Sequence, residues 1–333
     1  MIGLLLFSLA SGAELVPVRS GDTVDSLVEA HGGDVTADQV RRANGLANGV
    51  EPDVGTLLSF PEAPGMVAQK AFLLTLRGTA TLDGAPAQQF DPVVADQELC
   101  TGDDSFATLR LATQCTTAGD RSDDLTLAPG TCVRLLGASG STSRRSTAVR
   151  VVSGSVTVQD NPDGVGHVTV QAGDAQTTGS HGGYRVTLEE EASARTEALY
   201  AAVAVQAARQ EVQLRAGQGS RVLPGQAPGA PVELLMPGTP TYPTDGADLR
   251  RADFGWTPAP DAFGYVFEIA TGSDFVDMVY LDEVPDSPHR PELLLLPWPD
   301  DGQLHWRIAT IDRLGFVGVP SKPSRIQLPR GAQ

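Results

Sequence analysis

The sequence has few lysines, few aromatic residues and few cysteines. Among its 333 residues, Lys70 and Lys322 are the only lysines, aromatic residues make up 5%, and the formal net charge is −17. Binding to nucleic acid depends on clustered cations that displace counterions from phosphates, and binding to anionic lipid depends on a basic surface. The acidic composition therefore argues against both kinds of partner.

A long hydrophobic run is also missing. The apolar stretch Ile2–Leu9 is far shorter than the ~20 residues that a membrane-spanning helix needs. It is followed by the small residues Ser11-Gly12-Ala13, which suit a signal peptidase site, although no basic residue precedes it. We interpret residues 1–13 as a signal peptide and expect no membrane span in the mature chain. The alternative is a buried first strand.

Only three cysteines are present, at positions 100, 115 and 132. In an exported protein an odd number predicts one disulfide and one remaining thiol. Cys115 lies in a polar stretch that looks like a loop, whereas Cys100 and Cys132 each border a strand-like run, so we favour a Cys100–Cys132 disulfide. No second ligand stands at a short metal-binding spacing, and the histidines form no pattern with a cysteine, so we expect neither a metal site nor a catalytic thiol.

What the sequence does contain is a compact pattern of turns and apolar spacings over residues 16–61. Val16–Val18 alternates with its neighbours as a short strand does. Val24–His31 and Thr36–Ala43 have helical spacing, follow or begin with capping residues, and are followed by glycine or Asn-Gly. Leu57–Pro61 reads as a strand closed by proline. The predicted order is therefore strand, helix, helix, strand.

This order, with the motifs Ser20-Gly21-Asp22-Thr23, Asn44-Gly45-Leu46 and Gly55–Pro61, resembles the LysM module. LysM modules bind glycans that contain N-acetylglucosamine, chiefly peptidoglycan and chitin. The resemblance implies a glycan-binding site in two loops, made of Gly21, Asp22, Thr23, Asn44, Gly45 and Leu46. The alternative is that these residues only shape turns. Both can hold, because backbone exposed at such turns is what a sugar amide would bond to.

From about residue 69 to residue 235 the apolar residues alternate with a period of two, as in short strands separated by turns. Clear stretches are 72–78, 106–111, 132–136 and 149–158. A strand–turn–strand unit recurs at 153–174 and 200–218, which favours a β-solenoid-like or jelly-roll stack.

The segment 189–211 is rich in Ala, Glu and Arg and has helical propensity. The alternation of Val203 and Val205 favours strands instead. We predict strands from about Leu199 onward and leave residues 189–197 open.

The central region resembles the FecR domain. The residues that carry this resemblance are Leu99–Gly102, Asp104–Leu111, Leu127–Thr131, Val151–Val158 and Gln171–Ala175. The best-known FecR proteins relay a signal from an outer-membrane receptor to a sigma factor through a membrane helix and a cytoplasmic tail. This sequence shows neither feature, so the resemblance implies the periplasmic β-domain more than the regulatory role.

All three tryptophans follow the Pro- and Gly-rich stretch Pro224–Pro231, which reads as a linker. Trp256-Thr257-Pro258, Tyr265–Ile269 and Trp306–Asp312 resemble the strands of fibronectin type III domains over about residues 232–329. Such domains are usually spacers or protein-contact modules. Because the aromatic residues occupy strand-period positions, we expect them to pack a sandwich core; the alternative is a carbohydrate platform.

The sequence contains several acidic pairs and runs, which would be compatible with a hydrolase, because glycosidases need two carboxylates on facing walls of a cleft. They are Asp103-Asp104, Asp123-Asp124, Glu189-Glu190-Glu191 and Asp300-Asp301. Adjacent carboxylates in turn-rich stretches are more simply solvated loops. No nucleophile elbow and no glycine-rich phosphate loop with a lysine is present, so we expect no enzyme and no cofactor.

The sequence thus predicts a mainly β, multidomain protein. Its expected parts are a signal peptide (1–13), a βααβ LysM-like module (14–65), a FecR-like β-domain (66–231) and a fibronectin type III-like sandwich (232–329). We expect a non-enzymatic protein of a bacterial periplasm or cell envelope that binds peptidoglycan or another N-acetylglucosamine-containing glycan. Its β-domains would serve as a scaffold or as contact surfaces for another envelope protein. The alternatives are a FecR-like sensory protein and an accessory protein of a peptidoglycan hydrolase.

Overall fold

The computed structural model is mainly β, as the sequence predicts. The structure describes residues 14–31, 36–47, 49–60, 71–111, 123–141, 144–160, 167–179, 182–243, 253–291 and 302–327. The predicted signal peptide (1–13), Cys115, Trp298 and Asp300-Asp301 lie outside the described residues.

The N-terminal part pairs one two-stranded sheet with two helices. β1 (Glu14–Pro17) and β2 (Leu57–Phe60) are antiparallel, and α1 (Val24–His31) and α2 (Ala37–Ala43) lie between them in the sequence. Spacings of three and four place apolar helical residues on one face. That face meets the strands in a core made of Val18, Val24, Leu27, Val40, Leu58 and Phe60.

Seventeen strands form one continuous, curled sheet in the centre of the protein. Its strands are β3 (Ala71–Arg77), β4 (Ala80–Leu82), β5 (Ala85–Pro86), β6 (Pro92–Val93), β7 (Glu98–Thr101), β8 (Phe106–Leu111), β9 (Asp123–Leu127), β10 (Cys132–Ser141), β11 (Arg144–Asp160), β12 (His167–Ala172), β13 (Ala175–Gly179), β14 (Gly182–Leu188), β15 (Ala194–Ala198), β16 (Val203–Ala207), β17 (Gln210–Leu214), β18 (Gln218–Val222) and β19 (Val232–Glu233). The predicted strands at 72–78, 106–111, 132–136 and 149–158 are confirmed.

The curled sheet folds into two layers that share β11. One layer has the order β19-β18-β15-β14-β11-β9-β8-β3-β6, and the other has the order β5-β4-β7-β10-β11-β12-β13-β16-β17. Apolar residues from both layers, such as Leu73 and Leu109 of one and Leu99 and Val133 of the other, are buried in a single cluster. Burial of these alternating side chains is the main stabilising term of the domain.

β11 passes from one layer to the other at Gly154. Before it, residues 144–151 pair with β10 and β12; after it, residues 154–160 pair with β9 and β14. Gly154 has φ +79°, and a Cβ there would lie 2.4 Å from Thr131 Oγ1. Only glycine fits this crossing without displacing Thr131.

The segment 189–211 forms strands, as predicted from Leu199 onward. Residues 189–197, for which the sequence did not decide between helix and strand, contain a short 3-10 turn at Glu190–Ala192 and then most of β15. β16 and β17 follow as a hairpin. Burial of Val203 and Val205 against the central core therefore outweighs the local helix propensity.

The C-terminal part contains two smaller sheets. β20 (Thr239–Tyr242) pairs with β21 (Gly255–Thr257). The other sheet has the order β23-β22-β24-β25, built from β22 (Gly264–Ala270), β23 (Met278–Val284), β24 (Gln303–Ile311) and β25 (Ser324–Gln327). Trp256 and Trp306 are buried between them with Phe254 and Phe267, so the expected role of these two tryptophans in the core is confirmed.

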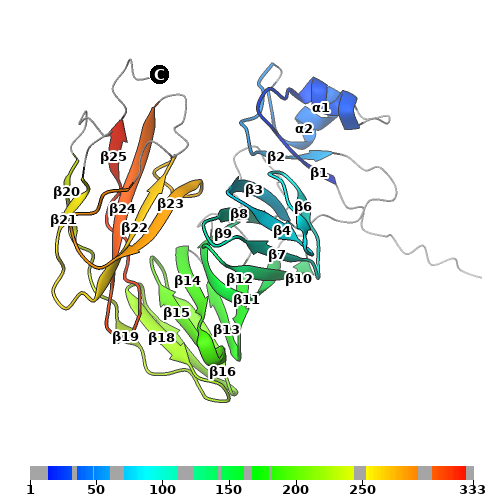
Figure 1. Ribbon diagram of the computed structural model, residues 1–333. Helices are drawn as coiled ribbons and strands as arrows, with labels where there is room; N and C mark the ends of the chain where they lie inside the picture. Colours follow the sequence, from blue (N-terminus) through cyan, green and yellow to red (C-terminus); the bar gives the residue numbers. More distant parts are fainter. Residues whose placement is uncertain are drawn as a thin grey trace, which may run out of the picture.

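Both outer parts contact the curled sheet, and Figure 1 shows the helices and the C-terminal strands on different sides of it. Arg110 of β8 donates from Nη1 to the carbonyl of Gly55 at 3.0 Å. On the other side, Arg77 of β3 donates to both carboxylate oxygens of Asp277 at 3.1 and 2.7 Å. Within the described residues, no helix is long and apolar enough to cross a membrane.

The interpretation of Asp123-Asp124 as part of a solvated loop is wrong. Both residues belong to β9 and are buried. Arg110 donates to Asp124 from Nε and Nη2, at 2.9 Å each. Burial raises the pKa of Asp124, and the arginine opposes that shift. A charged pair on adjacent strands can be buried because each partner satisfies the other, which the sequence alone does not show.

Candidate functional site

The first predicted loop is a tight turn that leads into α1. Asp22 Oδ2 accepts a hydrogen bond from the backbone of Arg19 at 2.8 Å, and Gly21 has φ +87° with open space around its Cα. Thr23 caps α1 reciprocally with Ser26: Thr23 Oγ1 accepts from Ser26 N at 3.1 Å, and Ser26 Oγ accepts from Thr23 N at 2.9 Å. Gly21 and Thr23 are exposed, so a ligand can reach this turn.

The second predicted loop ends α2 in a Schellman motif. Gly45, at φ +64°, donates to the carbonyl of Arg42 at 3.3 Å, and Leu46 donates to that of Arg41 at 2.9 Å. Leu46 packs on the module's core. Asn44 is buried and donates from Nδ2 to the Val40 carbonyl at 2.7 Å. In this loop only Gly45 is fully exposed, so the side chains of Asn44 and Leu46 serve the fold.

Glu51, which follows the second loop, joins it to the first. Its Oε2 accepts from Val24 N, the first residue of α1, at 2.7 Å, and its Oε1 accepts from Arg41 Nη2 at 2.9 Å. The same Arg41 nitrogen donates to Asp25 Oδ2 at 3.0 Å, and the hydrogen bonds to the two carboxylates raise the pKa of Arg41. The connection after Leu46 therefore lies against the turn that contains Thr23.

Two valines on that connection were missed by the sequence reasoning. Val50 and Val54 flank Glu51 and are 49% and 61% exposed. The sequence does contain a sign of their exposure. Each is an isolated valine among Gly, Pro and Asp residues, where no strand or helix is expected to bury it. They add exposed apolar side chains to this connection, and the turns at Gly21 and Gly45 add exposed backbone to the module.

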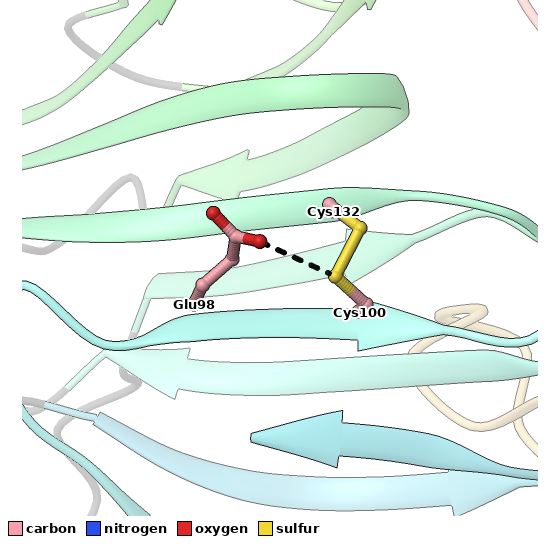
Figure 2. Close-up of side chains that lie close together, drawn as sticks. All are labelled: Glu98, Cys100 and Cys132. Atoms are coloured by element: carbon pink, nitrogen blue, oxygen red, sulfur yellow. Dashed lines mark hydrogen bonds between the residues drawn. A yellow bond between two sulfur atoms is a disulfide. The ribbon is translucent and has the colours of Figure 1, made fainter. Parts of the chain in front are cut away.

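Cys100 and Cys132 are joined in a disulfide between β7 and β10, where they are directly opposite each other (Figure 2). Glu98 lies beside the two cysteines, with its Oε1 3.8 Å from Cys100 Sγ, and the three residues form a cluster of possible metal ligands. Because a bonded sulfur has neither a thiolate charge nor a proton to donate, this cluster is not a metal site as it stands. Glu98 instead accepts from Arg134 Nη2 at 2.8 Å.

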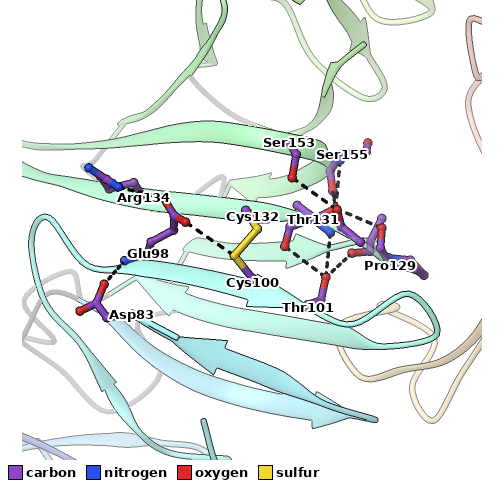
Figure 3. The surroundings of a disulfide bond; sticks show 12 residues. Asp83, Glu98, Cys100, Thr101, Pro129, Thr131, Cys132, Arg134, Ser153 and Ser155 are labelled. Atoms are coloured by element: carbon purple, nitrogen blue, oxygen red, sulfur yellow. Dashed lines mark hydrogen bonds and ion pairs between the residues drawn. A yellow bond between two sulfur atoms is a disulfide. The ribbon is translucent and has the colours of Figure 1, made fainter. Parts of the chain in front are cut away.

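The turn beside the disulfide is held by threonines (Figure 3). Thr101 Oγ1 accepts from Thr131 N at 3.0 Å, and it donates to the Ala128 carbonyl at 2.7 Å. Thr131 Oγ1 accepts from Ser155 N at 3.0 Å. The disulfide and these bonds together fix the Pro129-Gly130 turn, which indicates a structural role.

No family model matches the chain, and no curated protein matches it. Two crystal structures of a "putative anti-sigma factor" from Parabacteroides distasonis ATCC 8503 are similar to it at 13% identity and a TM-score of 0.32. The similar region spans 41% of this chain and 59% of the matched chain in one structure, and 43% of this chain and 68% of the matched chain in the other.

Proposed function

We propose that the protein is an exported component of a bacterial cell envelope that binds peptidoglycan through residues 14–65, a LysM-like module. The FecR-like β-domain (66–231) and the fibronectin type III-like domain (232–329) then serve as scaffold or contact surfaces. The observation that carries the proposal is the approach of the two turns of the helical module, which Glu51 links through Val24 N and Arg41.

The chemistry of this surface suits an N-acetylated sugar. An acetamido group offers one N–H, one carbonyl and a methyl group. Exposed backbone at Gly21 and Gly45 supplies polar partners for the amide, and Val50 and Val54 supply apolar contact for the methyl group. A site of this size binds weakly by itself and gains affinity when several copies meet one polymer.

The test is co-sedimentation of the full chain with purified peptidoglycan. Val54→Glu places a charge on the proposed surface without touching the core, and we expect it to weaken binding about tenfold. Val152→Glu is the matched control, because Val152 is 42% exposed on β11, outside the module. Leu46→Glu is a poor test, since Leu46 packs on the module's core.

Binding by the unaltered protein and by Val152→Glu, with loss in Val54→Glu, supports the proposal. Circular dichroism of each variant reports whether it is folded. Equal binding by all three folded proteins contradicts the site assignment, and no binding by the unaltered protein contradicts the function.

A further inference from the structure

A cavity of about 130 Å³ lies between the curled sheet and the C-terminal domain. Its lining comes from β8, β9, β11, β14 and β15 on one side and from β22, β23 and β24 on the other. Exposed Glu283 belongs to the lining, so the cavity reaches the surface. None of these residues belongs to the helical module.

The wall from the curled sheet is mainly polar, because most of it is the outer face of that sheet. Val156 and Val158 point into the central core, so Ser155 and Thr157 point outward into the cavity. Thr157 is directly opposite Arg185 of β14, and Arg185 also lines the cavity.

The facing wall is mainly apolar. Phe275 and Met278 are buried there in one cluster with Phe106 of β8, and Leu281 packs against that cluster. The charged residues on this wall are Glu268 of β22, which is directly opposite Leu281, Glu283 of β23 and Arg307 of β24. The cavity therefore combines hydrogen-bonding and charged groups with an apolar surface made mainly by the C-terminal domain, which is the usual lining of a small-molecule site.

Arg185 lacks the partners that a buried guanidinium needs. Its side chain is 8% exposed, and it has five N–H donors. The Nε atom donates to Thr157 Oγ1 at 3.4 Å, the Nη2 atom lies 3.8 Å from Glu268 Oε1, and Nη1 has no hydrogen-bond partner among the described residues.

Glu268 does not fill this gap, because it already serves another arginine. Its Oε2 accepts a close hydrogen bond from Arg307 Nε, and the Arg307 guanidinium lies 3.8 Å from the centre of the Phe275 ring. Glu268 thus serves both Arg185 and Arg307. Glu197 of β15 is directly opposite Arg185, but its carboxylate accepts from Arg195 Nε and makes no hydrogen bond to Arg185 Nη1. A carboxylate ligand beside Arg185 would supply the acceptor that Nη1 lacks.

We propose that this cavity binds a small organic anion, a monocarboxylate with a compact apolar body. The carboxylate binds Arg185, and the body lies against Phe275, Met278 and Leu281. An apolar protein cavity of about 150 Å³ holds one benzene molecule, so the body is no larger than a single ring or a short branched chain. Because both domains line the site, the bound anion also strengthens their contact. This inference does not depend on peptidoglycan binding.

The experiment is isothermal titration calorimetry of the full chain with benzoate as the probe and benzamide as its uncharged counterpart. Arg185→Met removes the charge and leaves Glu268 paired with Arg307. Leu281→Phe fills part of the cavity and leaves Arg185 in place. Arg77→Met is the matched control, because Arg77 joins the same two domains through Asp277 and does not line the cavity.

We expect benzoate to bind the unaltered protein and Arg77→Met equally, and to bind at least about tenfold more weakly to Arg185→Met and to Leu281→Phe. Benzamide should bind at least about tenfold more weakly than benzoate to the unaltered protein. Equal binding of benzoate and benzamide, or full benzoate binding by folded Arg185→Met, overturns the assignment of an anion. Absence of benzoate binding to the unaltered protein overturns the proposal.

Discussion

Glu197 Oε1 accepts a hydrogen bond from the backbone N–H of Val317 at 3.3 Å, although the two residues are 120 positions apart. Glu197 belongs to β15 of the curled sheet and is fully buried, and Val317 belongs to the C-terminal domain. The same carboxylate oxygen accepts from Arg195 Nε at 2.6 Å. A titrating group thus stands directly in the contact between two domains.

This position predicts that the contact weakens as the pH rises. Burial raises the pKa of Glu197 above its ordinary value of 4.5, and Arg195 and Arg185 only partly oppose the shift. Between the unfolded and folded pKa values the folded protein holds more protons than the unfolded chain. The contribution of Glu197 to stability is therefore full below pH 4.5 and is lost as the pH rises through the folded pKa.

The measurement is an NMR titration of the Val317 amide, whose chemical shift follows the charge on its acceptor. We expect a midpoint above 4.5. Glu197→Gln keeps an oxygen acceptor and removes the titration, so its amide shift should stay flat over the same range. A midpoint at or below 4.5 in the unaltered protein would show that the arginines outweigh burial.

Reduction of the Cys100–Cys132 disulfide should destabilise the curled sheet. The bond closes a loop with a sequence separation of 32, for which the chain-entropy model gives ~3–4 kcal/mol. The strands should still pair, because residues 98–100 are in register with 132–134. Urea unfolding followed by circular dichroism, with and without reductant, measures the loss. Cys115→Ser in every sample prevents exchange with the third thiol, and an unchanged midpoint would contradict the prediction.

Glu51→Gln should loosen the helical module and weaken peptidoglycan binding together. The substitution weakens the hydrogen bond at the N-terminus of α1 and leaves Arg41 with Asp25 as its charged partner. Loss of the whole cap would cost about 1 kcal/mol, and glutamine keeps one oxygen acceptor, so the expected loss is below that value. Asp53→Asn is the control, because Asp53 is an exposed carboxylate two residues further along. Thermal unfolding measures the stability of each variant, and co-sedimentation measures its binding to peptidoglycan. Equal melting temperatures and equal binding for Glu51→Gln and Asp53→Asn would show that Glu51 does not hold the two turns together.

Sequence periodicity predicts the strands of the curled sheet well because each strand has one buried face. Val149, Val151, Val156 and Val158 all lie in the central core, so the alternation along β11 is a direct record of burial. The same reasoning places Trp256 and Trp306 in the C-terminal core. Strands that bury one face in the core of their own domain can therefore be predicted from the sequence.

Contacts made by the outward side of an element are not visible in this way. Arg185 and Asp124 occupy outward positions of strands, where a charged residue normally meets water, yet both are buried: Asp124 beside Arg110 of the adjacent strand, and Arg185 beneath the C-terminal domain that carries Glu268. Glu51 caps a helix that begins 27 residues earlier. Periodicity carries information about the face of an element but none about what later covers that face, so the cavity and its arginines could not be predicted.

Gly219 of the curled sheet packs closely against Phe316 of the C-terminal domain. A Cβ at Gly219 would lie 2.7 Å from Phe316 Cδ1. The Phe316 ring is buried and lies below the guanidinium groups of Arg195 and Arg221, at 5.9 and 5.3 Å from its centre. The ring therefore has little room to move, and Gly219→Ala should destabilise the C-terminal domain by about 1–3 kcal/mol.

A double-mutant cycle separates this steric effect from a general weakness of β18. Phe316→Ala removes the two ring atoms nearest to that Cβ, Cδ1 and Cε1, so Gly219→Ala should cost less in that background than in the unaltered protein. All three tryptophans follow residue 231, so their fluorescence during urea unfolding reports on the C-terminal domain. Additive losses in the double variant would show that Gly219 and Phe316 do not restrict each other. A smaller loss than the sum would establish that glycine is required there by the close approach of the second domain.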